Sequence, residues 1–294
     1  MATSLCLRPS YTRVCGGGTA SVFGKPTDFR GLFEKESLLA CMVQHVRDQG
    51  VSKLLLPNVS HFNARIADSC ELFQKKVDVD GVGVYTQCFV DGVRITKGQA
   101  LFIASADCPT LVFSIPQGDF VVVCHAGKNS LLDPCRIDHS GKVRTHGSVV
   151  DRALEFFKGN KKDLRIDVLC GIGAQAVNYS ASDQKYGDQN KTLISYVFDK
   201  WGGEVFAPLL KGGKMVRPSG FDRCMEGHLD FFALVRAQAK IHGVPHVNIL
   251  SDGVCTYTDG TGSHGGRFWS HKRQVEGGVA SAEGKRNGVL VAFT

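Results

Sequence analysis

A cysteine and a histidine at the ends of two expected strands are the residues of this sequence best placed for chemistry. Cys108 precedes an apolar, β-branched run over residues 110–115, and His125 follows a similar run over residues 120–124. The Pro-Gln-Gly-Asp segment between the runs is typical of a turn, so the two runs are expected to pair as a β-hairpin. Such a hairpin would return His125 to the neighbourhood of Cys108.

A thiolate and an imidazole that lie close together allow two kinds of chemistry. They can share a zinc ion, or the imidazole can activate the thiol as a nucleophile. The spacing of Cys108 and His125 does not choose between these possibilities. A third donor would favour the metal, and His61, which follows another expected short strand, is a candidate. Taken alone, a free cysteine is usually an inert core residue, and a single histidine is usually a hydrogen-bonded structural residue.

Alternating helices and strands are expected to position these side chains. A helical period of apolar residues is found over residues 36–49, 148–158 and 231–241. The strands expected after these helices cover residues 53–56, 166–170 and 247–250. A further strand is expected at residues 100–104, just before Cys108. This alternation predicts an α/β fold.

The composition favours a soluble globular protein, and we expect a single domain over residues 1–294 and a monomer or homodimer. A content of 43% hydrophobic and 21% charged residues allows a sizeable core. The 35 Lys and Arg residues are scattered and give a formal charge of only +7, so no nucleic-acid partner is expected. Eleven cysteines without a C-x-x-C pattern are typical of reduced thiols in the cytoplasm. No run approaches the roughly 18 apolar residues of a membrane span, so no membrane is expected.

Two segments around the Cys/His pair carry a family resemblance. Ala106-Asp107-Cys108-Pro109 is similar to a T-A-D-C-x-P motif, and His125-Ala126-Gly127 is similar to the start of an H-A-G-W-R-G motif. Further similar segments are Thr12-Arg13 with Gly16-Gly17-Gly18-Thr19 (R-x-G-G-x-S), Val59-Ser60-His61 (Q-V-H-G), Gly171-Ile172-Gly173 (G-P-x-I-G), 227–238 (H-L-D-L to N-R-A-Q), Gly253-Val254-Cys255-Thr256 (G-x-C-T) and 266–273 (F-x-S-Y-R-R). In this order over one chain, they resemble the laccase-domain family, also called YfiH-like or polyphenol-oxidase-like.

Members of that family are regarded as zinc-dependent purine nucleoside phosphorylases. The resemblance implies a layered α/β/β/α sandwich with mixed sheets, in the fold group of YfiH-like cysteine hydrolases. It also implies Zn²⁺ held by His61, Cys108 and His125, with Cys108 and His125 as the catalytic pair. The implied partners are a purine nucleoside and phosphate: adenosine or inosine would be split to the base and ribose 1-phosphate, or adenosine would be deaminated.

One departure from the family pattern bears on substrate binding. The Trp-Arg-Gly of the second motif is replaced by Lys128-Asn129-Ser130, at the start of an apparent insert over residues 128–147. Lys128 could supply the lost charge as a point cation, and Arg144 could return it from the insert. The full set of candidates for substrate binding is Arg13, Lys128, Arg144, Cys255, Arg267 and Arg273. Residues 268–273 combine aromatic and basic side chains, which suits base stacking and anion binding, or else an exposed strand edge.

Two other functions are compatible with the sequence. Cys108 could be the nucleophile and His125 its base in a metal-independent hydrolase, such as a protein glutamine deamidase. The missing Trp-Arg pair also fits a non-catalytic descendant that binds nucleotides or a protein. Metal content separates the first alternative from the zinc enzyme, and turnover of inosine with phosphate separates the second.

Overall fold

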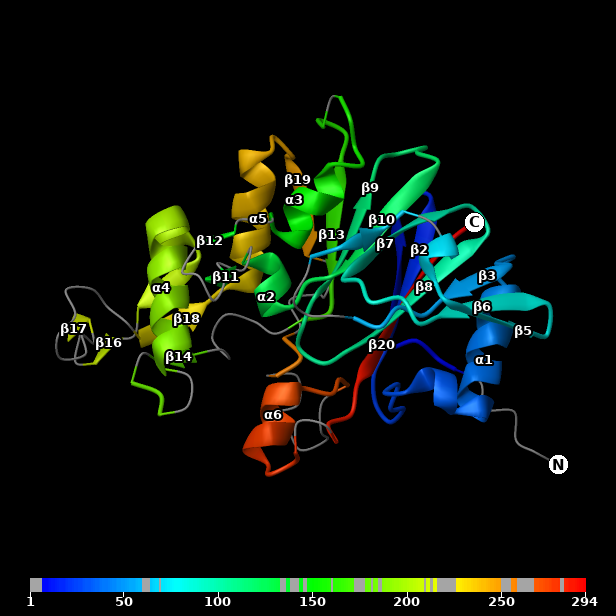
Figure 1. Cartoon of the computed structure of the whole chain (residues 1–294), viewed down its shortest axis with the longest axis horizontal. Helices are drawn as coiled ribbons and strands as arrows, with labels where there is room; N and C mark the ends of the chain where they lie inside the picture. Colours follow the sequence, from blue (N-terminus) through cyan, green and yellow to red (C-terminus); the bar gives the residue numbers. More distant parts are fainter. Residues whose placement is uncertain are drawn as a thin grey trace.

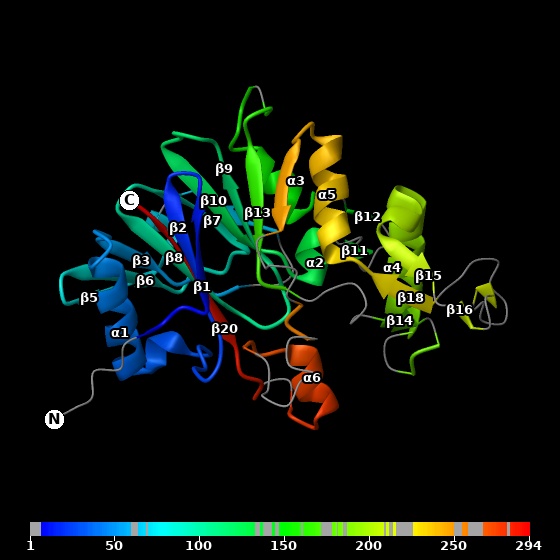
Figure 2. The same cartoon turned by 180° about the vertical axis from the view of Figure 1, so that it is seen from behind.

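Two β-sheets lie face to face at the centre of the fold, with helices on their outer faces (Figure 1 and Figure 2). The computed structural model describes residues 7–59, 64–68, 70–132, 136–137, 143–144, 147–159, 161–171, 178–180, 182–184, 187–208, 210–211, 214–215, 226–249, 255–257, 267–280 and 283–294. Within them the layers follow the order helix, sheet, sheet, helix. This order confirms the α/β/β/α sandwich that the resemblance implied.

The first sheet has seven strands in the order β1-β2-β20-β8-β3-β6-β5. Their bounds are β1 Tyr11–Cys15, β2 Gly18–Phe23, β20 Asn287–Phe293, β8 Gln99–Ser105, β3 Lys53–Leu55, β6 Val82–Thr86 and β5 Lys75–Val79. The sheet is mixed, because β3 runs parallel to β6 and β8 while its other neighbouring pairs are antiparallel. Helix α1 (Glu36–Arg47) covers the outer face, where its Met42 and Val46 join a buried cluster with Phe102 and Leu290.

The second sheet has six strands in the order β19-β13-β9-β10-β7-β4. Their bounds are β19 His246–Ile249, β13 Arg165–Leu169, β9 Thr110–Ser114, β10 Phe120–His125, β7 Gly92–Thr96 and β4 Ile66–Ala67. This sheet is also mixed, since β13–β19 and β4–β7 are parallel pairs. Its outer face packs against helices α2 (Lys128–Leu131), α3 (Val149–Leu154) and α5 (Phe231–Ile241), as in the buried cluster of Leu131, Val150, Leu234 and Phe113.

Strand β8 shows how the sequence encodes the stacking of the two sheets. Leu101 and Ile103 belong to the buried cluster that the sheets share, whereas Ala100 and Phe102 belong to the cluster under α1. Side chains of a strand alternate between its two faces, so a continuous apolar run is suited to a strand that is covered on both sides. The apolar run before Cys108 therefore fixes β8 inside the sandwich.

The remaining elements lie around these layers. They are η1 Leu32–Glu34, η2 Cys70–Leu72, β11 Arg136–Ile137, β12 Val143–Arg144, β14 Asn178–Ser180, α4 Gly187–Trp201, η4 Gly202–Glu204, β15 Phe206–Pro208, β16 Leu210–Lys211, β17 Lys214–Met215, β18 Glu226–Leu229 and α6 His271–Glu276. Helix α4 and the sheet β14-β18-β15 lie at the end of the molecule opposite α1 (Figure 1). Among the described residues, no helix has the length and apolar character needed to cross a membrane.

Most elements expected from the sequence are present with similar bounds. The β9–β10 hairpin is confirmed, and α1 and α5 lie where the apolar period predicts helices. Helix α3 ends at Leu154 rather than at residue 158, because the next backbone bonds are of the tighter turn type, such as Phe156 N–H to the Ala153 carbonyl. The interpretation of residues 268–273 as an exposed strand edge is wrong: Phe268 is 2% exposed, and α6 follows it.

Helix α3 depends on the interactions of its first turn. The Ser148 hydroxyl accepts a hydrogen bond from the Asp151 N–H, and the Asp151 carboxylate accepts one from the Ser148 N–H. His242 Nε2 lies 2.5 Å from Asp151 Oδ1 and ties the turn to the end of α5. Burial alone would raise the pKa of Asp151, but the hydrogen bonds from His242 and Ser148 outweigh it and lower the pKa.

We expect Asp151→Asn to lower the free energy of unfolding by about 1 kcal/mol at pH 7, the usual loss for a helix cap. A carboxyl whose pKa is lowered by folding stabilises the protein above its unfolded pKa of about 3.9, and this contribution is lost as the pH falls through the folded pKa. In urea unfolding, the gap between wild type and variant should therefore shrink as the pH falls below about 4. The exposed Asp163→Asn is the control, and a gap that is equally large in acid would contradict the assignment.

Candidate active site

Cys108 lies in the turn where the chain crosses from one sheet to the other. β8 ends at Ser105 in the seven-stranded sheet, and β9 begins at Thr110 in the six-stranded sheet. The Ser105 hydroxyl donates a hydrogen bond to the Cys108 carbonyl (2.9 Å), and Asp107 has a φ of 79°. Cys108 is half-buried in this tight crossing.

The hairpin returns His125 to this turn. His125 of β10 pairs with Thr110 of β9, and the N–H of Ala126 donates a hydrogen bond to the Pro109 carbonyl (2.7 Å). A Cβ at Gly127 would lie 3.0 Å from His125 Cε1 and 3.6 Å from Cys108 Sγ. The buried imidazole and the thiol therefore converge on the same stretch of backbone, and the glycine leaves the space that they need.

Asp107 fastens the Cys108 turn to two distant segments of the chain. Its Oδ1 accepts a hydrogen bond from the Thr256 hydroxyl (2.6 Å). Its Oδ2 accepts from the Ser270 hydroxyl (3.0 Å) and the Lys272 N–H (2.8 Å). A buried carboxylate with three donors is well satisfied, so Asp107 acts as a structural anchor for the residue that follows it.

The surroundings of Cys108 favour the neutral thiol. Burial and the neighbouring Asp107 carboxylate raise the pKa of Cys108 to about 12, while Arg286 and Ser105 act in the opposite direction. The thiolate is the form that attacks a substrate or binds a metal. A cation placed next to the sulfur would favour that form.

Arg286 brings a positive charge to the Cys108 turn. It precedes β20, in which Asn287 pairs with Ser105, so the backbone register places Arg286 beside the residues that lead to Cys108. Burial lowers the pKa of Arg286, and the charge interaction with Cys108 opposes that shift. The guanidinium is therefore close enough to the thiol for an electrostatic interaction.

Lys128 brings a second positive charge to the same site. It begins α2, directly after the N-cap Gly127, and its Nζ lies 5.4 Å from the centre of the Tyr179 ring. Burial raises the pKa of Tyr179, and the proximity of Cys108 adds to the shift. Lys128, which replaces the family's tryptophan, thus lies beside the Cys108–His125 pair. Its helix α2 packs on α5, where Gln238 donates a hydrogen bond to the Leu131 carbonyl (2.5 Å).

Two further substrate-binding candidates lie close to the Asp107 anchor. Arg273 donates from Nη2 to the Thr256 carbonyl (2.7 Å), so its guanidinium holds the segments that contact Asp107. Cys255 is buried next to Thr256 and belongs to the core cluster under α5. Arg273 and Cys255 therefore have a structural role next to the Asp107 anchor.

The other candidates are not brought to the Cys108–His125 pair. Arg13 lies on the edge strand β1, and the register from Arg13 through Ala20 and Val291 leads to Leu101, near the opposite end of β8 from Cys108. Arg267 is exposed, and its guanidinium lies 5.5 Å from the centre of the Phe268 ring. The backbone of Arg144 pairs with Arg136 in β11, and the side chain of Arg144 lies outside the described part of the chain.

The zinc site implied by the family resemblance lies only partly within the described residues. Cys108 and His125 are described, whereas His61 is outside the described ranges. Within those ranges, no group of three His, Cys, Asp or Glu side chains could hold a metal ion. The two described donors fit zinc, because sulfur and imidazole nitrogen are ligands that zinc prefers and both face the space above Gly127.

Sequence reasoning gave no role to Asp107, Arg286 or Tyr179. Asp107 stands inside the motif that identified Cys108, so a polar residue next to a strand end was the available signal. Arg286 carries no local signal, because only the β20–β8 register brings it to the site. Long-range pairing of this kind is not visible in one sequence.

The fold and the pair together define the class of the protein: an α/β/β/α sandwich with a Cys–His centre where the chain crosses between its sheets. Comparison with known proteins gives the family. The family described as multi-copper polyphenol oxidoreductase laccase matches residues 74–284, which is most of the chain, so the protein belongs to that family.

Similar proteins include one named relative and several solved structures. A Xylella fastidiosa protein named purine nucleoside phosphorylase is 24% identical over 243 residues, which is 80% of this chain and 75% of the relative. A Neisseria meningitidis structure gives a TM-score of 0.62 at 14% identity, over 96% of this chain and 98% of that chain. The Bacillus licheniformis hypothetical protein YfiH gives 0.61 at 15% identity, over 96% and 99%. These structures share the fold.

Proposed function

We propose that the protein is a zinc-dependent enzyme that acts on purine nucleosides and splits adenosine or inosine with phosphate. The observation that carries the proposal is the convergence of the Cys108 thiol and the His125 imidazole at Gly127. The family and the relative named purine nucleoside phosphorylase support it.

His61, Cys108 and His125 would hold the zinc ion, with a fourth position open to substrate or water. When bound, zinc supplies a Lewis acid that polarises an oxygen in that position. Burial keeps His125 in one place, since its side chain is 1% exposed. The Asp107 anchor keeps Cys108 in position opposite it.

Arg286 and Lys128 are the residues that we assign to phosphate. In phosphorolysis a phosphate oxygen forms a bond to C1′ of the ribose, the bond from C1′ to the base breaks, and the base leaves with that electron pair and takes up a proton. Arg286 Nη1 donates to the Gly284 and Lys285 carbonyls, and the backbone N–H donates to Asp28 Oδ1 (3.0 Å), whereas the other guanidinium N–H groups make no hydrogen bond to a described residue. Those donors suit an anion next to Cys108.

We expect Arg286→Gln to raise the KM for phosphate about tenfold to 100-fold, the equivalent of one charge-assisted hydrogen bond. The KM for the nucleoside should change much less, and Arg286→Lys should restore part of the phosphate binding. The exposed Arg8→Gln serves as the control for loss of a cation. An unchanged KM for phosphate in Arg286→Gln would remove Arg286 from the phosphate site.

The proposed function is tested by two measurements on the purified protein. Chromatography of a reaction with inosine should show hypoxanthine and ribose 1-phosphate only when phosphate is present; with adenosine, inosine as product would indicate deamination instead. Elemental analysis should find about one zinc per chain, and removal of it by a chelator should abolish turnover until zinc returns. A fully active protein without metal would exclude zinc dependence.

We also propose that the enzyme works in the cytoplasm. The cysteines within the described residues are all free, including the partly exposed Cys41, Cys70 and Cys108. Thiols that remain reduced are typical of that compartment.

A further inference from the structure

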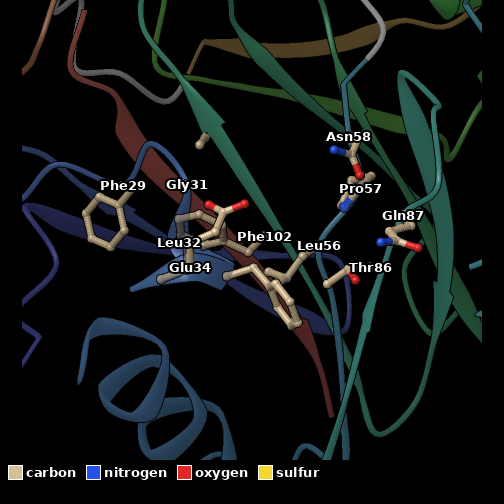
Figure 3. Close-up of a pocket in the computed structure, with 12 residues that line it drawn as sticks. Phe29, Gly31, Leu32, Glu34, Leu56, Pro57, Asn58, Thr86, Gln87 and Phe102 are labelled. Carbon is tan, nitrogen blue, oxygen red and sulfur yellow. The ribbon is translucent and has the colours of Figure 1, made fainter. Parts of the chain in front are cut away.

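A pocket with an aromatic floor lies on the α1 side of the seven-stranded sheet. It is formed at the carboxyl ends of the parallel strands β3, β6 and β8, where ligands of α/β sheets are commonly bound. Figure 3 shows Phe29, Leu32 and Glu34 on one side and Asn58 and Thr86 on the other. The cavity has a volume of about 290 Å³, close to the lower end of small-molecule pockets, about 300 Å³. This size suits a small ring system.

The floor of the pocket is apolar and aromatic. Phe29 and Phe102 have ring centres 5.3 Å apart at an angle of 47°, and both rings are buried. Leu32 and Leu56 complete the buried floor, and Phe33 is half-buried at the edge. Such a surface favours a flat, apolar face of a ligand.

Four polar side chains of the described part of the chain line the same pocket. The buried Thr86 hydroxyl has no hydrogen-bond partner among the described residues. The side chains of Glu34, Asn58 and Gln87 are exposed, and none of them forms a hydrogen bond to another described residue. In binding sites, a few convergent polar groups above an apolar floor orient the ligand.

The charges of the pocket select the chemistry of its ligand. Glu34 supplies a carboxylate acceptor, and the amides of Asn58 and Gln87 can both donate and accept. Among the described residues, no lysine or arginine lines the cavity; Lys75 lies 4.8 Å from the centre of the Phe33 ring but is not part of the lining. A ring with N–H donors and acceptor nitrogens would be satisfied here, whereas a phosphate group would face a carboxylate without a cation.

We propose that this pocket binds an uncharged purine-like base, free or as its nucleoside, at a site separate from the Cys108–His125 pair. Neither Cys108 nor His125 is among the lining residues. The pocket and the Cys108–His125 pair are neighbours. Phe29 of the pocket donates its N–H to the carbonyl of Arg286 (3.1 Å), the residue whose guanidinium interacts with Cys108. The inference does not depend on the proposed function, because binding is measured without turnover.

Isothermal titration of the purified protein with adenine and adenosine tests the inference. Glu34→Gln should weaken binding about tenfold, the value of one hydrogen bond to a charged group, and Thr86→Val should weaken it about fivefold, the value of a neutral one. Adenosine monophosphate should bind at least about tenfold more weakly than adenosine, because its phosphate is repelled by Glu34. Thr86→Val keeps the shape of the side chain and removes a hydroxyl without a described partner, so it should not impair folding.

Two controls separate this pocket from the Cys108 centre. Glu36→Gln makes the same change of charge on an exposed residue outside the lining and should bind adenosine as wild type does. In Cys108→Ser, adenosine binding at the pocket of Glu34 and Thr86 should remain, while any adenosine binding at the Cys108 centre is lost. If Cys108→Ser loses binding while Glu34→Gln and Thr86→Val keep it, the ring is held at the Cys108 centre and the inference is overturned. Absence of binding of both adenine and adenosine to wild type overturns it as well.

Discussion

His125→Ala should lower kcat/KM for inosine about 10²–10⁴-fold, the range for loss of a group that acts on the reacting atoms. Its ring is 1% exposed and meets the Cys108 sulfur at Gly127, so no other described side chain can take its position. Zinc content should fall together with turnover, because removal of one ligand weakens the metal site. Cys108→Ser is expected to give the same two losses.

The controls for this experiment separate chemistry from folding. His246→Ala removes an exposed histidine of β19, and Cys41→Ser removes a partly exposed cysteine of α1. Both should keep their activity and metal content. Circular dichroism should show that His125→Ala remains folded. If that folded variant retains wild-type turnover, the Cys108–His125 pair is not the catalytic centre.

The part of the site carried by neighbouring strands could be predicted from sequence. The two apolar runs and the turn between them define the β9–β10 hairpin, and the hairpin alone places His125 opposite the residues after Cys108. Helix α1 could also be predicted from the sequence, because its buried residues lie on one helical face. Local patterns suffice where the interacting residues lie within one hairpin or one helix.

The part that depends on distant segments could not be predicted. Helix α4 begins with the polar residues Gly187-Asp188-Gln189-Asn190, which weakens its apolar period at the start. An exposed strand edge was one of two interpretations of residues 268–273, although Ser270 is a residue type typical of a helix N-cap. The pocket of Glu34 and Thr86 combines the short helix η1 and the strand β6, which are far apart in sequence. A single sequence contains no information on such pairings.

Replacement of Asp107 should destabilise the protein strongly. Asp107→Ala leaves the Thr256 and Ser270 hydroxyls and the Lys272 N–H without their acceptor in a buried place. We expect a loss of about 3 kcal/mol or more in the free energy of unfolding, since each unsatisfied buried group costs about 1–3 kcal/mol. Alanine also fits poorly at a φ of 79°, which adds a further cost of about 1–2 kcal/mol.

Asp107→Asn separates these two contributions, because asparagine tolerates a positive φ and differs only in its amide. One of its side-chain atoms becomes a donor facing donors, so most of the loss should remain even though the backbone is not strained. Asp119→Asn, in the exposed β9–β10 turn, should change stability by less than about 0.5 kcal/mol.

A double-mutant cycle decides whether Asp107 acts through the contacts seen here. If its hydrogen bond to the Thr256 hydroxyl matters, Thr256→Val should cost less in the Asp107→Asn background than in wild type, by about 0.5–3 kcal/mol. Additive costs would mean that the two residues stabilise the protein independently. Coupled costs, together with a fall in kcat larger than that in Asp119→Asn, would show that the anchor from β8 to Thr256 and α6 holds Cys108 in its working position.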